Sequence, residues 1–211
     1  MSKVLEIAQA VESGKAKLVV ELVEAALAEG IEPMVILNDG MVGAMSNIGE
    51  KFRKNEIFVP EMLVAAKAMK KGVEALKPHL GGGESHKIGK MAMGTVYGDL
   101  HDIGKNLVVM MIESAGFEVV DLGVDVAPET FVKTAIEQNC DIICCSALLT
   151  TTMTAMADVV KAAADAGIRD KVKIMVGGAP VDQRFCDHIG ADSYTRDAAS
   201  AADAAAAFMA K

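Results

Sequence analysis

Apolar residues recur at spacings of three and four through the first 79 residues, a pattern typical of helices that bury one face. Leu18, Leu22 and Ala26 form one such stripe. A second comprises Met34, Leu37, Met41, Met45, Ile48 and Phe52, and a third Leu63, Ala66, Met69, Val73 and Leu76. Gly30 is placed to end a helix, and Pro33 suits a first helical turn. We therefore predict a four-helix bundle over residues 1–80.

The hydrophobic pattern changes after a glycine-rich stretch at residues 81–86, which we interpret as a linker. Short apolar runs rich in β-branched residues follow, separated by helical stretches. The runs lie at 91–96, 117–123, 140–148, 171–178 and 191–194, and the helical stretches at 104–116, 127–138, 151–166, 180–189 and 197–210. This alternation predicts an α/β domain over residues 87–211, with a flavodoxin-like (Rossmann-type) five-stranded parallel sheet.

Composition excludes several classes of partner. The chain has 211 residues and a formal net charge of −8, and no block of Lys or Arg indicates a nucleic-acid partner. No window approaches the roughly 18 apolar residues of a membrane span, and the N-terminus lacks the apolar core of a signal peptide. The four cysteines show no CxxC spacing and are expected to be buried free thiols. We therefore expect a cytoplasmic protein.

Candidate chemistry lies after the first predicted strand, in the sequence GDLHDIGKN (98–106). Such loops lie at the ligand-binding edge of a parallel sheet. The sequence is not a Walker A motif, because five residues separate Gly98 from Gly104 and Asn106 stands where Ser or Thr is required. It is not a GxGxxG fingerprint either. A phosphohydrolase site would need further His and Asp ligands, and the plainest alternative is a solvated loop whose aspartate caps a helix.

The spacing Asp99-x-His101 has a more specific meaning. One ring nitrogen of such a histidine can bind a metal while the carboxylate accepts a hydrogen bond from the other. A protein-built zinc site needs three or four ligands, but one ligand suffices for a metal already held by a macrocycle. Gly104 would let the helix start lie close to a large flat ligand.

This loop resembles the DxHxxG signature of cobalamin-binding domains. Ser146–Thr150 resembles that family's SxL…T segment, and Gly177-Gly178 its paired glycines. Residues 43–69 are similar to the helical cap of cobalamin-dependent methionine synthase and of small corrinoid proteins. The resemblance covers nearly the whole chain, with its elements in order.

The resemblance implies a role for each matching residue. His101 would be the lower ligand of cobalt, replacing the cofactor's dimethylbenzimidazole (base-off/His-on binding), and Asp99 and Ser146 would continue the hydrogen-bond chain. The nucleotide tail would lie beside Ser146, Thr150 and the two glycines. The full set of implied cofactor contacts is Gly98, Asp99, His101, Asp102, Gly104, Ser146, Leu148, Thr150, Gly177, Gly178, Tyr194 and Ala198, with Phe52 and Val59 of the cap over the upper corrin face.

The function implied is that of a corrinoid methyl carrier, inactive without partner enzymes. Co(I) cobalamin would accept a methyl group from a donor-specific methyltransferase. Methyl-Co(III) would pass it to a second methyltransferase that acts on a folate or a thiol, and an ATP-dependent reactivator is a third expected partner. Methanol, methylamines, quaternary amines and aryl methyl ethers all stay open as donors. The alternatives are the small subunit of an adenosylcobalamin-dependent mutase, which lacks this cap, and a B12-sensing module.

Overall fold

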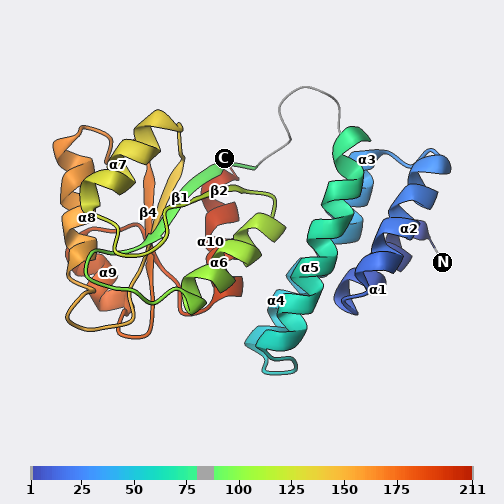
Figure 1. Ribbon diagram of the computed structural model, residues 1–211, viewed down its shortest axis with the longest axis horizontal. Coiled ribbons are helices and arrows are strands. Elements are labelled where there is room, and N and C mark those ends of the chain that lie inside the picture. Colours follow the sequence, from blue (N-terminus) through green and yellow to red (C-terminus); the bar gives the residue numbers. More distant parts are fainter. Residues whose placement is uncertain (1, 80–87, 211) are drawn as a thin grey trace. The chain divides into compact units, whose positions relative to one another are not determined.

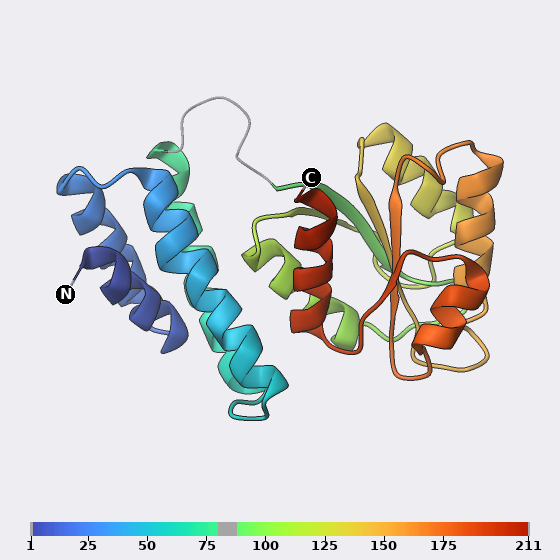
Figure 2. The same cartoon turned by 180° about the vertical axis from the view of Figure 1, so that it is seen from behind.

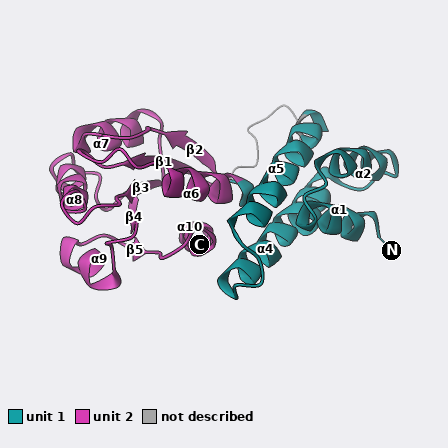
Figure 3. Ribbon diagram, turned by 60° about the horizontal axis from the view of Figure 1, so that its bottom comes forward, with its two compact units in different colours: residues 1–87, 114–116 teal, residues 88–113, 117–211 magenta. Residues whose placement is uncertain are grey.

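The computed structural model describes residues 2–79 and 88–210, so the predicted linker at 81–86 lies outside the described residues. The chain divides into two compact units, one helical and one α/β (Figure 3). Each unit has buried apolar residues of its own. No helix among the described residues is long and apolar enough to cross a membrane.

The N-terminal unit contains the predicted bundle of helices. Its elements are α1 (Lys3–Glu12), α2 (Ala16–Ala28), α3 (Pro33–Val35), η1 (Ile36–Val42), α4 (Gly43–Arg53), α5 (Val59–Leu76) and η2 (Lys77–His79). Gly30 follows α2 with a φ of 80°, and Pro33 begins α3, as predicted. The segments α3, η1 and α4 follow one another directly. The π-helical geometry of η1 was not predicted, because spacings of three and four do not distinguish it from an α-helix.

The predicted apolar stripes supply only part of the core of this unit. On α2 the buried residues are Val19, Val23 and Ala26, whereas Leu18 of the predicted stripe is exposed. The buried residues include Val19, Val23, Ile36, Met41, Met45, Ile48, Met62, Met69 and Leu76. Helices α2 and α5 approach closely at Gly72, where a Cβ atom would lie 2.8 Å from Val19 Cγ1. Phe52 is only half-buried, so the stripe of α4 leaves the core at its C-terminal end.

The C-terminal unit is a doubly wound α/β domain, as predicted. Its elements are β1 (Lys90–Thr95), α6 (Ile103–Ser114), β2 (Glu118–Asp121), α7 (Pro128–Glu137), β3 (Ile142–Ser146), α8 (Ala155–Asp165), β4 (Lys173–Gly177), α9 (Gln183–Ile189), β5 (Ser193–Tyr194) and α10 (Ala198–Met209). All strand pairs are parallel, in the order β2-β1-β3-β4-β5. Helices α6 and α10 cover one face of the sheet, and α7, α8 and α9 cover the other (Figures 1 and 2).

The order of the strands fixes where a ligand can bind. The chain leaves β1 toward β2 on one side and returns to β3 on the other, which makes the C-terminal ends of β1 and β3 the switch point of the sheet. The register places Thr95, Ser146 and Gly177 side by side at that edge. The β1–α6 loop with Asp99 and His101 therefore begins at the edge where doubly wound domains bind ligands.

Candidate functional site

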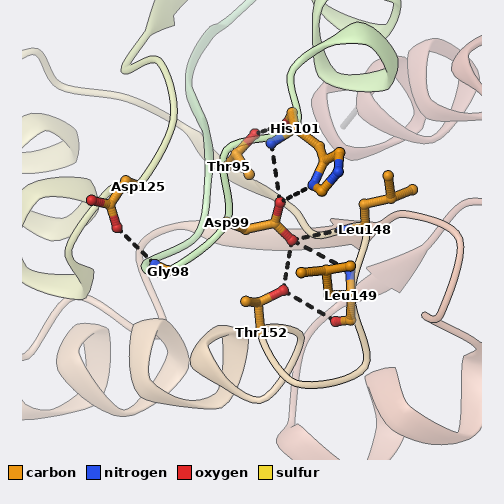
Figure 4. A network of polar contacts seen from close by, with 8 residues as sticks. All are labelled: Thr95, Gly98, Asp99, His101, Asp125, Leu148, Leu149 and Thr152. Carbon is orange, nitrogen blue, oxygen red and sulfur yellow. Dashed lines mark hydrogen bonds and ion pairs between the residues drawn. The ribbon is translucent and has the colours of Figure 1, made fainter.

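The centre of the site is the side chain of Asp99, which is fully buried although it lies in a loop. Its Oδ2 accepts hydrogen bonds from Thr152 Oγ1 at 2.6 Å, from the Leu148 amide at 2.8 Å and, more weakly, from the Leu149 amide at 3.4 Å. Its Oδ1 lies 2.7 Å from His101 Nδ1 and accepts the His101 amide at 3.1 Å (Figure 4). The carboxylate thus joins the β1–α6 loop to the turn after β3.

These hydrogen bonds keep Asp99 charged. Burial by itself raises the pKa of the carboxyl group, but the hydrogen bonds from Thr152, Leu148 and His101 outweigh burial and hold the pKa well below its usual range. A charged carboxylate beside Nδ1 fixes the tautomer that carries a proton on Nδ1 and makes the ring a stronger ligand.

His101 is fixed through its backbone carbonyl and through one ring nitrogen, while much of its side chain is exposed. Thr95 Oγ1, at the end of β1, donates to the His101 carbonyl at 2.8 Å, and Asp99 holds the ring through Nδ1. The side chain is nevertheless 50% exposed. Because Nδ1 is engaged, Nε2 is the ring atom that can bind a metal.

The hydroxyl that contacts Asp99 belongs to Thr152, which differs from the role that the resemblance implies for Ser146. Ser146 ends β3 in register with Gly177, and none of the hydrogen bonds found on Asp99 comes from it. The turn after β3, at residues 147–154, carries Thr152 back to Asp99 and buries it. This turn contains several threonines, at 150–152 and 154, and no periodicity within a turn selects one of them.

The residues expected around the nucleotide tail gather at the same edge. Ser146 and Gly177 are register partners, Gly178 follows, and Thr150 is exposed in the turn after β3. Gly178 has a φ of 129°, and a Cβ atom there would collide with the Ala147 carbonyl oxygen. The glycine is thus required first by the close approach of two backbones, and not only by space for a ligand.

The start of α6 is held by a buried lysine that the sequence did not single out. Lys105 is 2% exposed, and its Nζ lies 2.7 Å from both carboxylate oxygens of Asp121 at the end of β2. Asp102 is exposed and accepts from Asn106 Nδ2 at 3.1 Å. Gly104 faces open space, where an added Cβ atom would meet nothing within 4 Å. The first turn of α6 is therefore fixed beneath an open surface.

The remaining predicted contacts lie on three elements. Tyr194 is half-buried in β5 opposite Val176, and Ala198 is buried at the first position of α10. In the helical unit Val59 begins α5 and is 39% exposed. The cofactor contacts assigned to these residues stay predictions.

The donor set around His101 fits a metal carried by a macrocycle. Among the described residues, no group of three or more His, Cys, Asp or Glu side chains could hold a metal ion. Large apolar side chains on the loops around the histidine and at the start of α6 are exposed. They are Tyr97 (63% exposed), Leu100 (71%), Ile103 (87%), Leu148 (45%) and Leu149 (42%). A single imidazole within an apolar surface suits one coordination position of a large, flat metal complex.

Comparison with known proteins identifies the family. A family model described as a B12 binding domain matches residues 89–206, and a second of the same description matches residues 5–77. The chain belongs to the family of B12-binding corrinoid proteins. This places both of its units within that family.

Named relatives agree with the family assignment. The chain is 45% identical to trimethylamine corrinoid protein 1 of Methanosarcina acetivorans, over 86% of this chain and 85% of the relative. It is 45% identical to the dimethylamine corrinoid protein of Methanosarcina barkeri, over 93% and 92%. A chain in the crystal structure of the methanol:cobalamin methyltransferase complex of Methanosarcina barkeri superimposes with a TM-score of 0.87 at 31% identity, covering 99% of this chain and 80% of that one.

Proposed function

We propose that the chain carries a methyl group on a corrinoid whose cobalt is bound by His101 from below. The observation that carries the proposal is the arrangement of Asp99, His101 and Thr152, in which a buried carboxylate orients an exposed imidazole. The bound corrinoid would supply the methyl-transfer chemistry, in which cobalt takes up a methyl group and later releases it.

The protein's own residues then have defined tasks. Asp99 Oδ1 holds the proton on His101 Nδ1, which leaves Nε2 as the atom that would bind the metal. Were the imidazole to leave cobalt, Nε2 would be free to take up a proton from solvent, and the charged Asp99 carboxylate, held by Thr152 Oγ1, would stabilise the protonated ring. The edge formed by Ser146, Gly177 and Gly178 would receive the displaced nucleotide tail. Phe52 and Val59 remain proposed contacts to the upper corrin face.

We further propose that the methyl donor is a methylamine. The trimethylamine and dimethylamine corrinoid proteins described above are each 45% identical to this chain, whereas the chain from the methanol complex is 31% identical. The first partner would accordingly be a methylamine methyltransferase. The second would be a methyltransferase that acts on a folate or a thiol, and an ATP-dependent protein would restore oxidised cobalt.

A transfer assay tests this function. The purified chain is loaded with hydroxocobalamin, reduced, and incubated with each donor together with the methyltransferase specific for it: mono-, di- or trimethylamine, or methanol. The proposal expects methylation with one of the amine systems and none with methanol. Transfer only from methanol would overturn the assignment of the donor while leaving the carrier function intact. A chain that binds no corrinoid would overturn both.

A further inference from the structure

The turn that follows β2 lies along the loop that carries His101. Four hydrogen bonds join this turn to the loop and to Thr95, the residue that ends β1. The Thr95 amide donates to the Gly123 carbonyl at 3.0 Å, and the Val126 amide donates to the Thr95 carbonyl at 3.0 Å. The Gly98 amide donates to Asp125 Oδ1 at 2.7 Å, and the Asp125 amide donates to the Asp99 carbonyl at 2.9 Å. Asp125 therefore contacts the loop on both sides of the peptide that leads into Asp99, and Figure 4 shows the first of these contacts, between its side chain and Gly98.

The backbone of Asp125 is unusual. Its φ is 54°, in the left-handed region that side chains other than glycine rarely adopt, and where aspartate and asparagine are tolerated best. Such conformations persist where the surrounding structure requires them, and they cluster at functional sites. In this turn the conformation directs both the amide and the carboxylate of one residue toward the same loop. Gly98, whose amide donates to this carboxylate, is also left-handed, with a φ of 79°.

We propose that Asp125 is a positioning residue, which acts through Gly98 and Asp99 to hold His101 in the geometry that ligates cobalt. The proposal rests on the proposed function. It assigns to the β2–α7 turn a part in cofactor binding, although the hydrogen bond of the Asp125 side chain goes to Gly98 and not to His101.

The physical consequence concerns the population of loop conformations. With Asp125 in place, the loop is held in the ligating form before any cofactor arrives. Without the carboxylate, the Gly98 amide loses its acceptor and the loop samples other conformations. An apparent dissociation constant rises in proportion as the binding-competent fraction falls. Loss of one charge-assisted hydrogen bond then weakens cobalamin binding about tenfold.

Three substitutions separate the hydrogen bond from the backbone conformation. Asp125→Asn keeps an acceptor oxygen and tolerates positive φ. Asp125→Gly tolerates positive φ but has no acceptor, and Asp125→Ala lacks both properties. Asn139→Ala is the matched control, because Asn139 is also left-handed, with a φ of 51°, and lies after α7 outside the site.

Two readouts are made on the full chain. The first is hydrogen exchange of the Gly98 amide in the cofactor-free protein, measured by nuclear magnetic resonance. The second is titration with hydroxocobalamin, giving a dissociation constant and the fraction of histidine-ligated cobalt from the absorbance spectrum. We expect faster exchange and about tenfold weaker binding for the Gly and Ala variants. Asn139→Ala should bind as the unchanged protein does. Asp125→Asn, which keeps an acceptor oxygen but not the charge, should bind more tightly than the Gly and Ala variants.

The outcomes are distinguishable. If the unchanged chain shows no histidine-ligated cobalt, the proposed function fails. If it does, but Asp125→Gly binds equally well and protects Gly98 equally, the positioning role is overturned. Weakened binding in Asn139→Ala would also overturn it, since the loss would then follow from backbone strain anywhere in the unit. Should Asp125→Ala fail to fold, the Gly and Asn variants still decide.

Discussion

The two edges of the sheet each hold a carboxylate, Asp192 half-buried and Asp99 fully buried, in different ways. At the N-terminal edge, Asp192 accepts the Ile174 amide at 2.8 Å and pairs with Arg169 at 2.9 Å and Lys173 at 3.2 Å. At the C-terminal edge, the partners found on Asp99 are amides, the Thr152 hydroxyl and the His101 ring. One carboxylate is compensated by cations, and the other is stabilised almost wholly by neutral donors.

The difference between the two carboxylates indicates different roles, with Asp192 contributing to stability and Asp99 to function. At Asp192 the negative charge is neutralised by fixed cations of the protein, so its effect is to join β4 to the segment before β5. At Asp99 the charge is kept without being neutralised, so it remains available to a histidine that carries a metal. Substitutions at the two edges should therefore change different properties of the protein and by different amounts.

Asp99→Asn should have the largest effect on cofactor binding. The amide still accepts from Leu148, but it no longer supplies a charge to His101 Nδ1. Loss of such an outer partner of a metal ligand reduces affinity about 10- to 100-fold. Titration with hydroxocobalamin measures it, and Asp192→Asn serves as the control at the opposite edge. Equal losses in the two variants would contradict the contrast.

Thr152→Val should come next, with about a tenfold loss of affinity, because it removes the hydroxyl on Asp99 Oδ2 at constant shape. Thr152→Ser should restore binding. A comparison with Ser146→Ala uses two ligands, cobalamin and cobinamide, a corrinoid without the nucleotide tail.

The loss of affinity in Thr152→Val should also be seen with cobinamide, whereas any loss of affinity in Ser146→Ala should be seen with cobalamin alone. The reverse result would return Ser146 to the hydrogen-bond chain.

Asp192→Asn should lower stability by about 1–2 kcal/mol and leave cofactor binding unchanged. Burial raises the pKa of Asp192, but hydrogen bonds from Ile174, Arg169 and Lys173 outweigh burial and lower it. Its contribution is therefore complete above the unfolded-state pKa of about 3.9 and is lost as the pH falls below that value. Urea unfolding at neutral pH should show the difference between variant and unchanged chain. At about pH 3 the difference should shrink, and a difference that stays constant would mean that the pKa of Asp192 is not lowered by folding.

Much of this organisation could be predicted from the sequence because it depends on repeating patterns. The alternation of apolar strands and helices predicted the five-stranded sheet, and the stripes of Met41, Met45 and Ile48 predicted the bundle. The spacing of Asp99 and His101 predicted their contact, since two residues within one loop are close in any conformation.

The residues that were missed act across the chain instead. Thr152 reaches Asp99 from a turn 53 positions away, and Asp125 reaches Gly98 from 27 positions away. Which hydroxyl of a threonine-rich turn faces a distant carboxylate depends on the path of that turn. The left-handed conformation of Asp125 likewise depends on the adjoining loop. Neither the choice of Thr152 nor the conformation of Asp125 can be predicted from the spacing of apolar and polar residues along the chain.

Every role proposed for Asp99, Thr152 and Asp125 depends on His101 as the ligand of cobalt, and electron paramagnetic resonance of the cob(II)alamin-loaded chain can establish that ligand. The protein is prepared with ordinary histidine and with histidine labelled with the heavy nitrogen isotope. We predict a cobalt signal split into triplets by one axial nitrogen, changing to doublets on labelling and lost in His101→Ala. A splitting that is unchanged by labelling and by His101→Ala would show that the cofactor's own base remains on cobalt, and would contradict the proposed ligand.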